Sequence, residues 1–494
     1  MPSPSLLYSM TALAFVVLIC GCSRETTEDT NQGSRRITQS DMSADTNVGV
    51  PSNGTIAQDS VTAAQDSGTA VVAQEWDASS SPTSSALPSQ DFRTELDATN
   101  SDPEKLQENA IIALDSGDVG EAFELVRDLK RLDGKNPQTI FLMARVLAEK
   151  HRFRQAVKML DELAIEFPDA KLPVLGQTAE WLVFQGDWQA AESRYLTLIS
   201  LVDETSLVDR LLSRLLMREG RRVEAKVLLR RLCRAGNVEE MDLRSLLSLA
   251  CPLPGDAVTD AFEPIGLEGT VRHAISKGEV AAAGEMLQRA LDETPASVTS
   301  AEYALRGRLL VLLEQFDRLP EWIKSAPDGS EEYSDYWFAI GVDQLQRSDF
   351  SAAVDSLGRA VIRDETDSRA YRVLGDALLG LGKPEQAQVA TERAGLIEQT
   401  VSLGDQMASN QQRDVGQISV LIDLLERLQR PLEALGWRGI QVAYGRANSM
   451  LDDAQARDVL KMINQNRIAQ LEKSDPAAKR LFVICGIDLL HESN

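Results

Sequence analysis

The residues best suited to chemistry in this sequence are arginines gathered in one short segment. Between Arg210 and Arg234 there are nine basic side chains and two acidic ones, whereas the whole 494-residue chain has a formal net charge of -24 at pH 7. Arg210, Arg214 and Arg218 recur at every fourth position, so a helix would carry them on one face. Guanidinium groups bind carboxylates and phosphates through paired hydrogen bonds. The segment therefore predicts a site for an anionic group; the alternative is a solvated face that offsets neighbouring acidic residues.

No group of residues typical of an enzyme accompanies these arginines. The sequence contains no nucleophile elbow, no zinc-binding HExxH helix and no Walker phosphate loop. His151, His273 and His491 lie more than a hundred residues apart, which disfavours a shared triad or metal site. Cys233 and Cys251 are interpreted as small buried hydrophobic residues, and a disulfide between them stays open for an oxidising compartment. We therefore predict no enzyme activity, no metal and no cofactor.

The first 22 residues resemble a bacterial lipoprotein signal peptide. An apolar run ends in Ile19-Cys20-Gly21-Cys22, which is similar to a lipobox, where the last cysteine is lipidated and becomes the mature N-terminus. The resemblance implies that Cys22 anchors the protein to a membrane of the cell envelope, facing the periplasm or the exterior. No Lys or Arg precedes the apolar run, so an uncleaved anchor or an ordinary signal peptide remains an alternative.

Residues 23–102 form a polar stretch between this signal and the rest of the chain. They are rich in Ser, Thr, Asp, Gly, Gln and Ala, and their only aromatic residues are Trp76 and Phe92. Such a composition cannot bury enough apolar surface to offset the entropy of ordering the chain. We predict a disordered linker.

The remainder of the chain is organised by an internal repeat that ends in alanine. Gly117–Ala122 recurs in altered form at steps of 34, 35 and 34 residues, and later copies follow beyond residue 277. The alanines that close the copies are Ala122, Ala156, Ala191, Ala225, Ala283, Ala353 and Ala387. A period of this length is typical of stacked helix pairs, in which small residues let the helices approach closely.

The repeat resembles the tetratricopeptide repeat (TPR) family. The unit that begins near Ser334 has Trp337, Gly341, Ala353 and Leu357 at the offsets of the family signature, and the next unit has Gly375 and Ala387. The resemblance implies an all-α, TPR-like solenoid of antiparallel helix pairs, preceded here by the disordered tether. It also implies that the first helix of each pair lines a concave groove. The arginines at groove offsets are Arg145, Arg210, Arg214, Arg218, Arg369 and Arg372.

Interruptions of the repeat divide the chain. We predict a TPR-like array of about four repeats over 103–250, a joint at 251–263 that contains the helix-breaking Pro252 and Pro254, and a second array over 264–400. The second array has about four repeats, one of them degenerate. Residues 401–494 are predicted to form a helical degenerate repeat and a C-terminal cap.

These features predict a non-catalytic scaffold that binds a protein or peptide segment, with or without acidic residues, in a concave TPR groove at the cell envelope. Two alternatives remain: an architectural component that uses its outer helix faces, and an accessory part of an enzyme or redox system. The strongly acidic composition argues against nucleic acid as a partner. The oligomeric state stays open.

Overall fold

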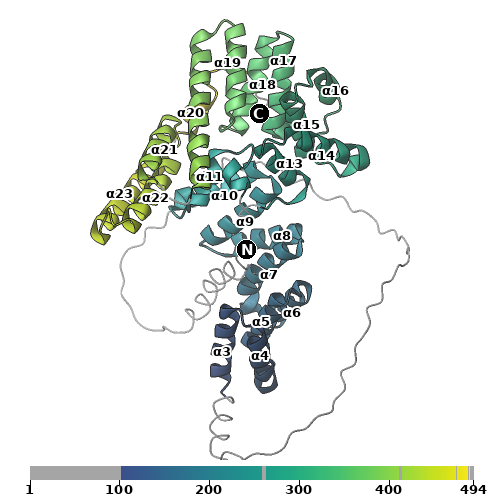
Figure 1. The fold of residues 1–494 in the computed structure, drawn as a ribbon, viewed down its shortest axis with the longest axis vertical. Helices are drawn as coiled ribbons and strands as arrows, with labels where there is room; N and C mark the ends of the chain where they lie inside the picture. Colours follow the sequence, from purple (N-terminus) through teal and green to yellow (C-terminus); the bar gives the residue numbers. More distant parts are fainter. Residues whose placement is uncertain (1–101, 259–262, 411–413, 474, 488, 490–494) are drawn as a thin grey trace, which may run out of the picture. The chain divides into compact units, whose positions relative to one another are not determined.

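The computed structural model describes residues 102–258, 263–410, 414–473, 475–487 and 489. The predicted signal peptide, Cys22 and residues 23–101 of the predicted linker lie outside these residues. All regular structure in the described ranges is helical, and successive helices pack as antiparallel pairs (Figure 1), which confirms the predicted TPR-like all-α fold. The chain divides into two compact units between Asp133 and Gly134.

The helix bounds follow the repeat. The first unit contains α3 (Pro103–Ser116) and α4 (Val119–Asp133). The second unit contains the pairs α5 (Pro137–Glu149) and α6 (Phe153–Glu166), α7 (Lys171–Gln185) and α8 (Trp188–Leu201), α9 (Ser206–Glu219) and α10 (Arg222–Ala235), then the short α11 (Glu240–Leu247) and α12 (Pro254–Ala257). It continues with α13 (Gly266–Ser276) and α14 (Val280–Glu293), α15 (Ser300–Leu312) and α16 (Leu319–Lys324), α17 (Ser334–Gln346) and α18 (Phe350–Arg363), α19 (Ser368–Gly380) and α20 (Pro384–Ser409), α21 (Val415–Arg427) and α22 (Pro431–Ala447), α23 (Asp453–Glu472) and α24 (Pro476–Val483).

The repeated alanines occupy one equivalent place in their helix pairs. Each is the fourth residue of the second helix and is at most 2% exposed; they are Ala122, Ala156, Ala191, Ala225, Ala283, Ala353 and Ala387. Ala434, also buried, has the same place in α22. The backbone N–H of each donates to the carbonyl four residues earlier, so all eight second helices start in the same way.

The turn inside each of these pairs needs a left-handed residue. Five residues before each alanine, φ is positive: glycine provides it at Gly117, Gly186, Gly220, Gly278 and Gly382, and non-glycine residues adopt it at His151, Ser348 and Gln429. Glycine reaches this conformation without a steric penalty, whereas a side chain with Cβ is strained there. Repeats with other residues at this position therefore carry local strain.

Glycines on the first helices allow close contact with the second helices. A Cβ at Gly341 would lie 2.5 Å from Cγ of Leu357, and one at Gly375 would lie 2.8 Å from Oγ1 of Thr391. Leu357 is itself fully buried. The small residues and the leucine thus fit into one another, as the repeat signature predicts.

The second unit is held by non-local packing as well as by neighbouring pairs. Its largest core contains residues from α5 to α11 together with Met407 of α20, Ile418 of α21 and Trp437 of α22. α22 contacts both α10 and α11, and α20 contacts α11 and α12. The helices after residue 400 therefore pack back onto the middle of the chain.

The predicted joint at 251–263 is packed where the structure describes it. Just before the joint, the N–H of Leu249 donates to Oγ1 of Thr366 at 2.8 Å, and within it the N–H of Gly255 donates to Asp405 at 2.6 Å. Ser276 donates its hydroxyl to the carbonyl of Pro252 at 2.6 Å. The residues around α12 are thus hydrogen-bonded to α13, to the segment between α18 and α19, and to α20.

The predicted degenerate repeat lies between Ala283 and Ala353. Its first helix, α15, has full length, but the second, α16, has six residues. Trp322 of α16 stacks on Tyr303 and donates its indole N–H to the Tyr303 carbonyl at 3.1 Å. The contact between Trp322 and Tyr303 therefore packs the short α16 against α15.

The C-terminal part begins with the pair of α21 and α22, followed by α23, which packs on α22. Beyond α24 the chain lies against α18, α19 and α20: the hydroxyl of Tyr371 donates to the carbonyl of Val483 at 2.9 Å, and Ile484 and Ile487 enter the core of that repeat. In the described part of the chain, no helix has the length and apolarity needed to cross a bilayer.

Candidate functional site

The three predicted groove arginines of α9 are engaged by acidic residues of the same chain. Arg210 donates from Nε to Oδ2 of Asp242 at 3.0 Å, and both Arg210 and Arg214 form ion pairs with Glu239. Arg218 donates from Nε to the carbonyl of Glu263 at 2.8 Å. These contacts fit the alternative that the arginines offset neighbouring acids. The groove role of the three arginines stays a prediction.

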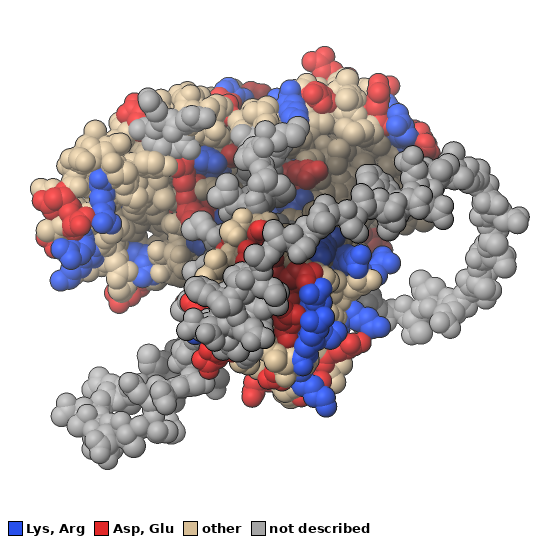
Figure 2. Space-filling view, turned by 60° about the horizontal axis from the view of Figure 1, so that its bottom comes forward, with Lys and Arg blue, Asp and Glu red and all other residues tan. Residues whose placement is uncertain are grey.

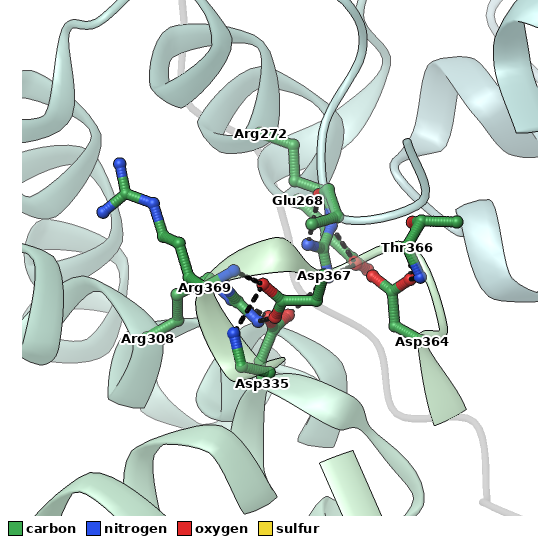
Figure 3. A network of polar contacts seen from close by, with 10 residues as sticks. Glu268, Arg272, Arg308, Asp335, Asp364, Thr366, Asp367 and Arg369 are labelled. Atoms are coloured by element: carbon green, nitrogen blue, oxygen red, sulfur yellow. Dashed lines mark hydrogen bonds and ion pairs between the residues drawn. The ribbon is translucent and has the colours of Figure 1, made fainter. Parts of the chain in front are cut away.

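The other predicted groove arginines lie on different helices. Arg145 of α5 is half-buried. Arg372 of α19 forms an exposed ion pair with Glu398 of α20, with Nε 2.7 Å from Oε1. Arg369 is exposed, and its side chain extends away from the neighbouring network of charges (Figure 3). The structure brings Arg210 and Arg214 together on Glu239, but it gives Arg372 a separate partner.

A buried network of ion pairs, which sequence reasoning missed, joins the first helices of the second array (Figure 3). Asp335 of α17 accepts hydrogen bonds from Arg272 of α13, at 2.8 Å, and from Arg308 of α15. Arg308 also donates to Asp367, the residue that caps α19. Glu268 pairs with Arg272 one helical turn away, at 2.8 Å. The network therefore links four successive first helices.

Burial and charge act in opposite directions in this network. Burial alone would raise the pKa of Asp335, but Arg272 and Arg308 outweigh it and hold that pKa below its ordinary value. Next to it, burial and the charge of Asp367 raise the pKa of Asp364, although Thr366 donates two hydrogen bonds to that carboxylate. Asp335 is thus stabilised as an anion, whereas Asp364 is not.

A second charged cluster joins α10 to the C-terminal helices. Arg230 contacts Glu365 before α19 and lies 3.7 Å from Glu433 of α22. Burial is the main reason why the pKa of Lys226 and that of Lys479 are lowered to about 8, and the charge of Arg230 adds to it. The cluster therefore joins α10, the connection before α19 and the C-terminal helices α22 and α24.

The described residues contain no group of three or more His, Cys, Asp and Glu side chains that could hold a metal ion. Cys233, Cys251 and Cys485 are free thiols. Burial raises the pKa of Cys233 and that of Cys251, so both thiols are protonated at neutral pH.

The ion pairs of the two buried charged clusters join different helices of the second unit. On the face shown in Figure 2, acidic and basic side chains lie side by side in small groups.

Comparison with protein families agrees with the helix pairs of α17 to α20. The sequence model of the tetratricopeptide repeat family matches residues 338–399, which run from α17 into α20. No curated protein matches the sequence. Among solved structures, a tetratricopeptide repeat protein from Parabacteroides merdae has 13% identity and a TM-score of 0.23, and the match covers 56% of this chain and 98% of that one. A structure of the APC/C hetero-tetramer Cut9-Hcn1 has 14% identity and a TM-score of 0.25, with 79% of this chain and 88% of that one covered.

Proposed function

The chain is a tetratricopeptide repeat protein, and we propose that it is a non-catalytic scaffold that binds a segment of a protein partner. The observation that carries the proposal is the repetition of one helix pair eight times, each time with a buried alanine at the same place. Such pairs hold their surface side chains in fixed positions before binding. The scaffold therefore loses little conformational entropy when a partner segment is bound.

We place this scaffold at the cell envelope, anchored through a lipid on Cys22. The support is the apolar run that ends at residues 19–22 and the resemblance of these residues to a lipobox. Mass spectrometry of the protein purified from membranes tests this part. A mature N-terminus at Cys22 with an acyl mass supports it, and a Cys22→Ser variant is the control in which the acyl mass should disappear.

Affinity capture tests the scaffold function itself. The intact chain is cross-linked in cells, purified from detergent-solubilised membranes and compared with the Cys22→Ser variant. The proposal predicts that specific proteins are enriched with the intact chain. Purified protein that captures no partner above the level of an unrelated lipoprotein would contradict it.

A second candidate is an architectural component that binds through its second helices. It is favoured by the α9 arginines, which already have partners within the chain, and by large apolar side chains that are exposed on second helices, namely Ile165 (81%) and Val227 (61%). A photoreactive residue at Val227 distinguishes the two candidates from one at Arg214. Cross-links from Val227 alone would favour the architectural role, and cross-links from Arg214 alone would favour a first-helix groove.

A further inference from the structure

An open groove lies between the second helix α14 and the following helix α15. Its volume is about 560 Å³, within the range of about 300–1,000 Å³ that is typical of ligand sites. Gly284 of α14 and Leu313 at the end of α15 line its apolar part, and Gln288, Arg306 and Arg318 line its polar part. The groove lies between the pair of α13 and α14 and the degenerate repeat, in which α16 is short.

Two guanidinium groups converge in this groove on an uncharged oxygen. Nη2 of Arg306 lies 2.7 Å from Oε1 of Gln288, and Nη2 of Arg318 lies 3.3 Å from the same atom. Arg306 is only 4% exposed, yet neither arginine forms an ion pair with any residue that the structure describes. Burial and the charge of Arg318 lower the pKa of Arg306, and the negative charge of Asp292 offsets this only in part. A buried cation of this kind is stabilised by an anion.

Arg306 stands where the other repeats have an uncharged residue. Counted eight residues back from the left-handed turn residue, its equivalents are apolar in five repeats (Met143, Leu212, Ile340, Leu374 and Leu421) and polar but uncharged in three (Asn109, Thr178 and Thr270). Leu212 and Leu374 are buried in the core of their repeats. The degenerate repeat thus has a charge at a position that is uncharged in all the others.

The chain itself shows what binds to the equivalent surface of a neighbouring repeat. Aligned on Ala283 and Ala353, Gln288 corresponds to Gly358; aligned on the turn residues Glu314 and Gly382, Arg318 corresponds to Gln386.

Both equivalents contact the C-terminal residues 482–487 and 489. A Cβ on Gly358 would lie 2.5 Å from Cδ2 of Leu489, and Gln386 donates to the carbonyl of Gly486 at 2.9 Å. Nη1 of Arg393 in α20 donates to the carbonyls of Phe482 and Val483. This surface therefore holds a peptide segment in one repeat and is open in the degenerate repeat.

We propose that the groove between α14 and α15 binds a segment of a protein partner through an Asp or Glu side chain. The carboxylate of that side chain forms ion pairs with both Arg306 and Arg318. This inference rests on the proposed scaffold function and adds the chemistry of the partner and the place where it binds. The site is distinct from the predicted arginine groove on α9. Glu285 and Glu293 line the exposed part of the groove, and Asp292 accepts a hydrogen bond from Nε2 of Gln288 at 2.8 Å. Among the described residues Asp292 forms no ion pair with Arg306 or Arg318, so the partner's carboxylate binds both guanidinium groups on the Oε1 side of Gln288.

Peptide binding tests the inference directly. The probes are fluorescent pools of nine-residue peptides with acetylated and amidated ends, degenerate except for a central Glu-Glu pair, and matched pools with Gln-Gln. We expect the full chain to bind the Glu pool about tenfold more tightly than the Gln pool at low salt, with the preference reduced at high salt.

Two substitutions convert the site to the residues of the intact repeat. In the double variant R306L/R318Q, each new residue is the one that α19 or α20 has at the equivalent position, so the fold should be retained, as checked by circular dichroism. We expect the preference for the Glu pool to disappear in this variant. Arg446→Gln, which removes an exposed arginine of α22 that does not line the groove, is the matched control and should keep the preference.

The inference would be overturned by equal binding of the two pools, by a loss in Arg446→Gln as large as in the double variant, or by complete displacement of the Glu pool by millimolar inorganic phosphate with no contribution from the peptide. A chain that captures partners from membranes but shows no preference for the Glu pool would refute the inference and leave the scaffold function intact. A peptide made from residues 23–101 of this chain could also be tested as a competitor. If it displaced the Glu pool and bound as tightly as that pool, the assignment of the groove to a separate partner would be overturned.

Discussion

Asp335 is the residue on which the buried network of first helices depends most. It is 2% exposed and accepts hydrogen bonds from two guanidinium groups, those of Arg272 and Arg308. Replacing it by Asn keeps the volume but leaves two buried cations with too little negative charge. Loss of one partner of a buried ion pair costs about 3–5 kcal/mol. Because Arg308 keeps Asp367 and Arg272 keeps Glu268, we expect a loss of about 3 kcal/mol for Asp335→Asn.

Glu398→Gln is the matched control for this substitution. It removes the charge from an ion pair with Arg372 in which both side chains are about half exposed. Such pairs contribute about 0–1 kcal/mol. Native-state hydrogen exchange of the amides in α13, α15 and α17 measures the loss locally, which avoids the assumption that the whole unit unfolds in one step. A loss for Asp335→Asn no larger than that for Glu398→Gln would refute the reasoning.

The same carboxylate predicts a dependence on pH. Because the pKa of Asp335 is lower in the folded protein than in the unfolded chain, its contribution is fully present above the ordinary pKa of about 3.9 and is lost as pH falls through the folded value. Acid unfolding should therefore be less steep for Asp335→Asn than for the wild type below about pH 4. Denaturant titrations at several pH values, followed by tryptophan fluorescence, measure this difference.

Glycine positions give two further predictions. Ser348 has φ of 61° in a turn where Gly382 has 75°, so Ser348→Gly should stabilise the chain and Gly382→Ala should destabilise it, each by about 1 kcal/mol, as measured by denaturant unfolding; equal effects of the two would contradict the role of the turn. Gly341→Ala should cost about 1–3 kcal/mol because its Cβ would overlap with the facing leucine. Gly395→Ala in open space on α20 should stabilise by up to about 1 kcal/mol, and a Gly341→Ala variant as stable as this control would refute the close approach.

The helix pairs were accessible from the sequence because they depend on residues close together in the chain. A buried alanine and a left-handed residue five positions earlier define the start of each second helix, and both recur with the repeat. Strict consensus was not required: His151 and Gln429 replace glycine in the turn, and the pairs still form. Local spacing therefore carries the information on which residues are helical and which face is buried.

The packing of the C-terminal helices α21 and α22 onto the core of α5 to α11 could not be predicted in the same way. Trp437 and Ile418 are buried in the core formed by α5 to α11, but nothing in their spacing distinguishes that surface from the next repeat in line. The buried arginines were missed for a related reason. Arg272 and Arg308 carry a charge at helical positions, and carboxylates that lie 27 to 63 residues further along the sequence, those of Asp335 and Asp367, help to make their burial favourable.

These non-local contacts change how a helix-repeat protein of this kind should respond to a partner. In an open array, each pair contacts only its neighbours, and stability is close to a sum of local contributions. Here Arg430 donates to the carbonyl of Leu246, 184 residues away in the sequence, and the core of α5 to α11 includes helices from beyond residue 400. Repeats joined in this way unfold together. A ligand bound only by the folded form stabilises everything that unfolds with its site, so occupation of one groove protects helices that the ligand does not touch.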